Sequence, residues 1–400
     1  MVVCALTLAT WALAPRHKAF DITASIALVA AIAQLVRRPT SPNYFLSGLT
    51  LGLVAYFGRN HGMYGAAGSA GILFYLALRC ENWMQWRRGI GWFMAGVGVG
   101  YLPMFATMLF AHGFTAAFID SIKFIFEVKS TNLPLPIPWP WSSPFWAEPS
   151  MYNLRELVIG LFFLTMLVFG LVAPIVVLVR RWKRQSVQPA LVACAFLALP
   201  YAHYSFSRAD PEHLALGIMP TLIGLCVLAG ISSSWKRTLI LLPLCALSLL
   251  AMLPDHQGWK CMGARNCPRI TIGKDQLRAD RRTVDDVTLF LKLQHDFAPN
   301  GRSAFVTPMQ PGVNALLGTK SPTLEIYTAW PRTEAFQREE IARLDAAKPG
   351  FVLIWDVALD NREELRYKNT HPLIDDYIKA NFEPVQGYSD YSMYEIYRAR

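Results

Sequence analysis

The polar turn Ser207–His213 is the segment of this sequence whose residue types are best suited to chemistry. It brings Arg208, Asp210, Glu212 and His213 together between two apolar runs. Carboxylates can accept protons, and arginine and histidine can hold a phosphate. Because ionisable side chains at membrane depth usually line a pocket or cavity, the turn is a candidate functional site. The alternative is an ordinary solvated loop.

A second set of polar residues lies near the ends of other apolar runs. Asp21 and Asp210 are the candidate catalytic groups, because a carboxylate can take the proton of an attacking hydroxyl or bind a divalent metal. Asp21 could instead cap a helix, Arg59 could extend to the membrane surface, and the lone His203 is expected to be an interior histidine. The candidate substrate-binding residues are Lys18, Arg59, His61, Arg208, Glu212 and His213.

Nine apolar runs must position these residues. Several approach the roughly 20 residues that a membrane-spanning helix needs, and 53% of the chain is hydrophobic. The runs are Val2–Ala14, Phe20–Val36, Tyr44–Phe57, Met63–Leu78, Ile90–Ala111, Leu157–Val179, Val187–Phe206, Leu214–Gly230 and Leu239–Leu253. The sequence therefore predicts about nine transmembrane helices in residues 1–254.

Charge separates this region from the rest and orients it. Residues 255–400 carry 20 basic and 20 acidic side chains, whereas residues 1–254 carry 18 basic and 8 acidic ones. Eleven of these 18 lie in four loops, at 37–38, 79–88, 180–184 and 236–237. Placing the four loops in the cytoplasm requires a cytoplasmic N-terminus and nine spans, with Arg16 and Lys18 as exceptions on the outer side. The excess charge thus marks membrane orientation, not a nucleic-acid partner.

Two segments allow more than one interpretation. Tyr44–Phe57 is short for a span, and a single unbroken helix over 44–78 is the competing prediction. The outer loop His112–Arg155 begins with an amphipathic pattern over Phe114–Val128 and continues as the proline- and tryptophan-rich segment Leu133–Trp141. This loop could roof a cavity or only anchor the chain in the headgroup layer.

Residues 255–400 are predicted to form a small soluble α/β domain outside the membrane. Helices are expected at Val284–Phe297, Glu334–Lys348 and Pro372–Ala380, and strands at Ser303–Thr307 and Phe351–Trp355, with Tyr391–Tyr397 as a closing edge strand. Asp356 and Asp360 follow a strand, where a turn or capping role is favoured over ligand binding. Cys261 and Cys267 are expected to form a small disulfide on the oxidising side, with two free thiols as the alternative.

Several stretches together resemble the GT-C glycosyltransferases, polytopic enzymes such as protein O-mannosyltransferases and aminoarabinose transferases that use polyprenyl-phosphate sugars. The resemblance is carried by His17-Lys-Ala-Phe-Asp21-Ile-Thr-Ala, Gly48–Arg59, Arg208-Ala-Asp-Pro-Glu-His-Leu214 and Gly312–Tyr327. It implies transfer of a sugar to a glycan, lipid or protein acceptor on the outer face of the cytoplasmic membrane. It implies no cofactor beyond an optional divalent metal ion.

The chain departs from this family at its start. The family has its principal acidic motif in the first outer loop, but Pro15–Ala19 has no carboxylate, and Asp21 matches the second outer carboxylate instead. We expect upstream coding sequence to supply further spans and this acidic loop; otherwise the chain is inactive as written. A non-catalytic membrane scaffold or binding protein with an outer domain is the alternative function. A transporter is disfavoured, because no internal repeat is evident and the polar groups lie at one face.

Overall fold

The computed structural model describes residues 1–14, 18–129, 132–256, 261, 267–387 and 393–400. The chain divides into two compact units, Met1–Trp259 and Lys260–Arg400. The first unit is helical, and the second combines helices with two small sheets.

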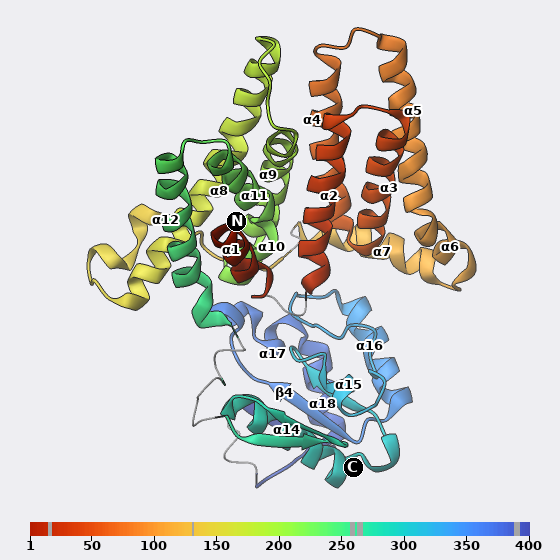
Figure 1. Cartoon of the computed structure of the whole chain (residues 1–400). Helices are drawn as coiled ribbons and strands as arrows, with labels where there is room; N and C mark the ends of the chain where they lie inside the picture. The colour runs from red at the N-terminus through yellow and green to blue at the C-terminus, as the bar shows by residue number, and fades with distance from the viewer. Residues whose placement is uncertain (15–17, 130–131, 257–260, 262–266, 388–392) are drawn as a thin grey trace. The chain divides into compact units, whose positions relative to one another are not determined.

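Every predicted apolar run of the first unit lies on a helix or on a pair of helices joined at a bend (Figure 1). Apolar residues from these helices form one buried core, which includes Trp11, Leu28, Phe163 and Tyr201. The helices are α1 (Val2–Ala12), α2 (Ala19–Arg37), α3 (Ser41–Phe57), α4 (Arg59–Ala77), α5 (Trp83–Gly100), α6 (Leu102–Phe110), α7 (Phe114–Val128), α8 (Met151–Trp182), α9 (Pro189–Ser207), α10 (Pro211–Gly217), α11 (Met219–Gly230) and α12 (Ser234–Met252).

Four of these helices are each long and apolar enough to cross a membrane, namely α2, α8, α9 and α12 with its 3-10 extension to Asp255. The pairs α5–α6 and α10–α11 bend by 43° and 60°. Counting each pair as one span raises the total to six in the described part of the chain. The shorter α1 and α3 and the glycine-rich α4 do not reach the same length and hydropathy, so four to six of the nine predicted spans are shown by length and composition, and nine crossings stay a prediction.

Glycines bring α3 and α5 into close contact. A Cβ atom added at Gly96 would lie 2.2 Å from the carbonyl oxygen of Phe45, and one at Gly52 would lie 2.3 Å from that of Val97. Gly48 and Gly100 make equally close approaches, so each helix presents two glycines four residues apart to the other. Membrane helices commonly pack through such small residues, because lipid supplies no hydrophobic force to drive helices together.

The single helix over 44–78, one of the two interpretations of this region, is wrong. The chain reverses at Gly58, and α4 packs back along α3. The close contact is seen at Gly62, where an added Cβ would lie 2.6 Å from the Cβ of Ala55. The turn places Arg59 and His61 in the first turn of α4. These side chains therefore start a helix rather than lie in its middle.

The helix predicted over Phe114–Val128 is confirmed at residue level. Helix α7 has the predicted bounds, contains no buried residue, and lies across the direction of α2 to α5 in Figure 1. Gly113 and Lys129, both with positive φ, bound it. The segment after it runs extended, with Trp139 stacked on Trp141, and packs so closely on α8 that a Cβ at Gly160 would lie 2.0 Å from the carbonyl oxygen of Pro138.

The second unit is built on a four-stranded sheet of order β3-β4-β6-β5. Strands β3 (Ala304–Thr307) and β4 (Phe351–Trp355) are parallel, whereas β6 (Tyr394–Ala399) pairs antiparallel with β4 and with β5 (Phe382–Pro384). The predicted edge strand is therefore an inner strand; its positions 391–392 lie outside the described residues. Helices α14 (Arg281–Phe297), α16 (Glu334–Ala347) and α18 (Pro372–Asn381) confirm the three predicted helices, with the short α15 (Val313–Leu316) and α17 (Tyr367–Thr370) beside them.

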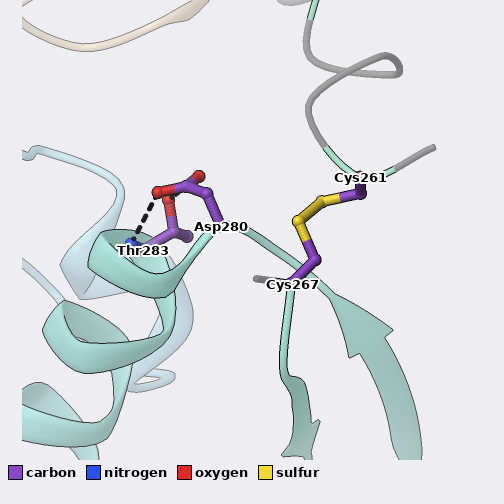
Figure 2. The surroundings of a disulfide bond; sticks show 4 residues. All are labelled: Cys261, Cys267, Asp280 and Thr283. Carbon is purple, nitrogen blue, oxygen red and sulfur yellow. Dashed lines mark hydrogen bonds between the residues drawn. A yellow bond between two sulfur atoms is a disulfide. The ribbon is translucent and has the colours of Figure 1, made fainter. Parts of the chain in front are cut away.

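A hairpin of β1 (Arg269–Ile272) and β2 (Asp275–Arg278) precedes the sheet and was not predicted. Cys261 and Cys267 form a disulfide bond beside it, as expected (Figure 2). Figure 2 also shows Asp280 capping α14, where its carboxylate accepts hydrogen bonds from the backbone and hydroxyl of Thr283. Asp356 accepts from Arg366, which agrees with a structural role.

Candidate functional site

A buried pair of Asp21 and His61 lies at the centre of the candidate site. Asp21 stands in the first turn of α2, and His61 in the first turn of α4; each residue is 2% exposed. Asp21 Oδ1 lies 2.6 Å from His61 Nε2, and Asp21 Oδ2 accepts a hydrogen bond from the Tyr204 hydroxyl at 3.1 Å. The other histidine nitrogen, Nδ1, lies 3.1 Å from the Tyr201 hydroxyl. A carboxylate fixes the orientation of the imidazole in this way, so the pair can store or pass on a proton.

The local sequence explains why this pair forms. The N-cap of α2 is Lys18, so the helix-capping alternative for Asp21 is wrong, and its carboxylate is free to face His61. Gly58 makes room for the imidazole, because a Cβ there would lie 2.8 Å from the His61 ring.

The predicted polar turn forms a second, partly buried cluster. Asp210 is the N-cap of α10, and its Oδ1 accepts from the backbone N–H of His213 and contacts His213 Nδ1, both at 2.8 Å. Its Oδ2 accepts from Arg208 Nε at 2.8 Å. Arg208 also donates to the Leu133 carbonyl, and His213 Nε2 lies 2.7 Å from the Asn132 amide. The turn therefore forms hydrogen bonds with the start of the proline-rich segment, which differs from the alternative of an ordinary solvated loop.

Charge and hydrogen bonding keep Asp210 ionised. Burial by itself raises the pKa of this carboxyl, but the hydrogen bonds from His213 and the charge of Arg208 outweigh burial and hold the pKa below its usual range. Asp210 is thus a permanent anion at neutral pH.

Tyr204 joins the two clusters. It donates to Asp21, its ring lies edge-on to His213 with centroids 6.0 Å apart, and the Lys18 ammonium lies 6.0 Å from its ring centroid. Lys18, Asp21 and His61 therefore lie in one neighbourhood with the turn residues Arg208, Asp210 and His213. Glu212, by contrast, is exposed in the first turn of α10.

An apolar groove of about 720 Å³ lies between α4, α7 and α9. Arg59 lines it and donates to Ser121 Oγ of α7 at 3.0 Å. Its remaining lining residues are Asn60, Met63, Tyr64, Ala67, Ile122, Ile125, Phe126, Leu199, Pro200 and His203. Asp21, Arg208 and Asp210 are not among them, so Arg59 lines a different part of the site from these three residues.

Tyr64 connects the groove to the buried pair. Its hydroxyl lies 2.9 Å from His203 Nδ1, and its ring centroid lies 6.3 Å from that of His61. His203 is exposed in the groove, so its expected interior position is wrong. The sequence interpretation missed Tyr64, Tyr201 and Tyr204. The available signal was the three-residue spacing of the last two, which places them on one face of α9.

The carboxylates do not form a metal centre in the described part of the chain. Both oxygens of Asp21 and both of Asp210 already face donors from this protein. No group of three or more histidine, cysteine, aspartate or glutamate side chains suited to hold a metal occurs there.

No protein-family model and no curated protein matches this sequence.

Proposed function

We propose that the chain is a membrane glycosyltransferase that moves a sugar from a polyprenyl-phosphate donor to an acceptor hydroxyl. The observation that carries this proposal is the groove between α4, α7 and α9, whose wall is apolar except at Arg59, Asn60, Tyr64 and His203. Ligand sites commonly combine apolar walls with a few polar groups. An isoprenoid chain matches the apolar wall, and its phosphate matches the guanidinium of Arg59.

The chemistry assigned to the buried pair follows from sugar transfer. The acceptor oxygen bonds to the anomeric carbon while the bond from that carbon to the phosphate oxygen breaks. The phosphate departs with the electron pair, and the acceptor proton needs a base. We assign this proton to the pair of Asp21 and His61, whose imidazole packs edge-on against Tyr64 of the groove wall. The Arg208–Asp210–His213 cluster is assigned to hold the proline-rich segment in place.

The proposal includes a membrane arrangement. The N-terminus and the four basic loops lie in the cytoplasm, nine segments cross the inner membrane, and the second unit lies outside the cytoplasm. The Cys261–Cys267 disulfide supports the last point, because disulfides persist in oxidising compartments. Thiol labelling at Arg184→Cys and Glu339→Cys in a chain without its native cysteines tests it. Labelling of both positions from the same side contradicts the arrangement.

A transfer assay tests the activity. Membranes that contain the full chain are incubated with a radiolabelled polyprenyl-phosphate sugar, and labelled product is measured at matched protein levels. We expect Arg59→Gln and Asp21→Asn to lower transfer at least tenfold, the effect of about 1.4 kcal/mol on the barrier. Asp120→Asn, which changes an exposed carboxylate of α7, is the matched control. Equal rates in all four proteins contradict the site assignment.

One observation favours the alternative of a non-catalytic scaffold. Asp21 and His61 are both 2% exposed, and a buried pair also suits a purely structural role. A scaffold of this kind shows no transfer and no labelling by a photoreactive polyprenyl phosphate. Labelling within 122–126 without transfer supports a lipid-binding protein instead of an enzyme.

A further inference from the structure

A second cavity lies at the other end of the helices from Asp21 and His61. It has a volume of about 270 Å³ and lies where α3 begins and where α4 and α8 end. Helix α4 runs from Arg59 to Ala77, so about 28 Å of helix separates the two ends. The lining residues are Pro39, Tyr44, Leu76, Arg79, Cys80, Glu81, Asn82, Gln85, Trp86 and Arg181.

Two arginines from different helices converge on this cavity. Arg79 follows α4; it donates to the backbone carbonyl of Trp182, and its guanidinium carbon lies 5.4 Å from the Trp182 ring centroid. Arg181 is in the last turn of α8, with its guanidinium carbon 4.9 Å from the Tyr75 ring centroid. The aromatic rings hold both guanidinium groups in place.

The two cations are not neutralised by protein groups in the described residues. Glu81 lines the cavity but forms no ion pair there with either arginine, and the buried Nε of Arg181 has no hydrogen-bond partner. Glu81 is also the single acidic residue in the four basic loops, which carry eleven lysines and arginines. The cavity therefore has positive charge and a hydrogen-bond donor that protein groups do not satisfy, and a bound anion would satisfy both.

The surrounding aromatic residues place this cavity at the depth of lipid headgroups. Trp83 stacks on Trp86 with ring centroids 4.4 Å apart, and Trp83 and Trp182 are exposed. Exposed tryptophans at the ends of apolar helices mark the interface between membrane and water. Basic pockets between membrane helices at this depth suit lipid phosphates.

We propose that this cavity binds the phosphodiester headgroup of an anionic phospholipid. Arg79 and Arg181 hold the phosphate oxygens, Asn82 and Gln85 lie beside the headgroup, and Leu76 and Trp86 contact the first part of the lipid. The site does not depend on the proposed glycosyl transfer, and it fastens the end of α4 to the end of α8 through a shared ligand.

Lipid retention by the purified full chain tests this proposal. The protein is prepared in a neutral detergent with equal amounts of phosphatidylglycerol and phosphatidylcholine, and bound lipid is counted by native mass spectrometry. We expect phosphatidylglycerol to be retained about tenfold over phosphatidylcholine, equivalent to about 1.4 kcal/mol, because phosphatidylglycerol has a net negative charge whereas the choline cation offsets the phosphate of phosphatidylcholine. The double variant Arg79→Gln/Arg181→Gln should lose this preference.

The control is Arg87→Gln/Arg180→Gln, which removes the same charge from exposed arginines that do not line the cavity. It should keep the preference. Arg181→Lys, which keeps the charge, should retain part of it, because an ammonium lacks the paired donors of a guanidinium. Equal losses in the two double variants, or no preference in the wild type, overturn the proposal. An increase in Tm with inorganic phosphate as large as that with phosphatidylglycerol shows an anion site that is not specific for lipid, and overturns it too.

Discussion

The pair of Asp21 and His61 allows a quantitative prediction about stability. The Asp21 carboxylate lies 2.6 Å from His61 Nε2 and accepts from the Tyr204 hydroxyl at 3.1 Å. Asp21→Ala leaves both groups buried without this acceptor, and an unsatisfied buried group costs about 1–3 kcal/mol. We therefore expect a loss of roughly 2–6 kcal/mol in the free energy of unfolding. At about 2 °C per kcal/mol, the Tm should fall by roughly 4–12 °C.

The companion variant His61→Ala leaves the Asp21 carboxylate buried without one of its hydrogen-bond partners, which should cost about 1–3 kcal/mol. The double variant removes both members of the pair, so neither side chain stays buried without its hydrogen-bond partner. Its effect should therefore be smaller than the sum of the single effects, by about 1–3 kcal/mol.

The assay is thermal unfolding of the purified full chain in one detergent at pH 7, followed by tryptophan fluorescence. The wild type and the three variants are compared with Asp120→Ala, which alters a side chain that is 69% exposed and should leave the Tm unchanged. Effects that add within about 0.5 kcal/mol would refute the coupling. A Tm for Asp21→Ala equal to that of Asp120→Ala would refute the buried pair itself.

Three further predictions concern other parts of the chain. Asp210→Asn keeps the helix cap but removes an ionised carboxylate whose pKa in the folded protein is lowered, despite burial, by His213 and Arg208. Compared with the wild type, the Tm of this variant should be lowest above about pH 4, the pKa of the carboxyl in the unfolded chain. The difference in Tm should shrink as the pH falls through the lower pKa of the folded state. A constant deficit down to pH 2.5 contradicts this. Gly96→Leu should lower the free energy of unfolding by at least about 1–3 kcal/mol. Gly98→Leu should leave it unchanged, because a Cβ at Gly98 meets nothing within 4 Å. Equal melting temperatures of the two variants in detergent would count against the glycine contact between α3 and α5. The denatured wild-type chain should react with maleimide at five thiols before reduction and at seven thiols after it. Reaction at seven thiols in both states would exclude the disulfide.

The helices were largely predictable because their signals are local. Phe114–Val128 was predicted to the residue, since its amphipathic spacing is bounded by Gly113 on one side and by the loss of the pattern at Lys129 on the other. The bends were missed although their cause is also local. The prolines at 103 and 220 stand at the start of the second helix in each bent pair, where they are compatible with a helix start but not with an uninterrupted helix.

The site was predictable by residue type but not by partner. Asp21 and His61 were selected because ionisable groups at the ends of apolar runs are costly without a purpose. Their contact joins residues 40 positions apart, and the tyrosines that surround them lie another 140 positions along the chain. Such distances depend on how helices pack, which periodicity does not specify. Likewise, β5 spans only three residues, too few to show alternation, so β6 was taken for an edge strand.

The apolar mouth of the groove has a consequence for how ligand binding is measured. Met63 and Phe126, at 70% and 75% exposure, stand on its lining, so the polyprenyl phosphate proposed above would reach it through the hydrocarbon phase rather than through water. Occupancy then follows the mole fraction of ligand among the surrounding lipids. Adding inert lipid or detergent at a fixed total amount of ligand should lower the apparent affinity in proportion, although the molar concentration in the sample is nearly unchanged. Binding constants for this chain are therefore comparable between preparations only when expressed per lipid molecule, as in surface-dilution kinetics.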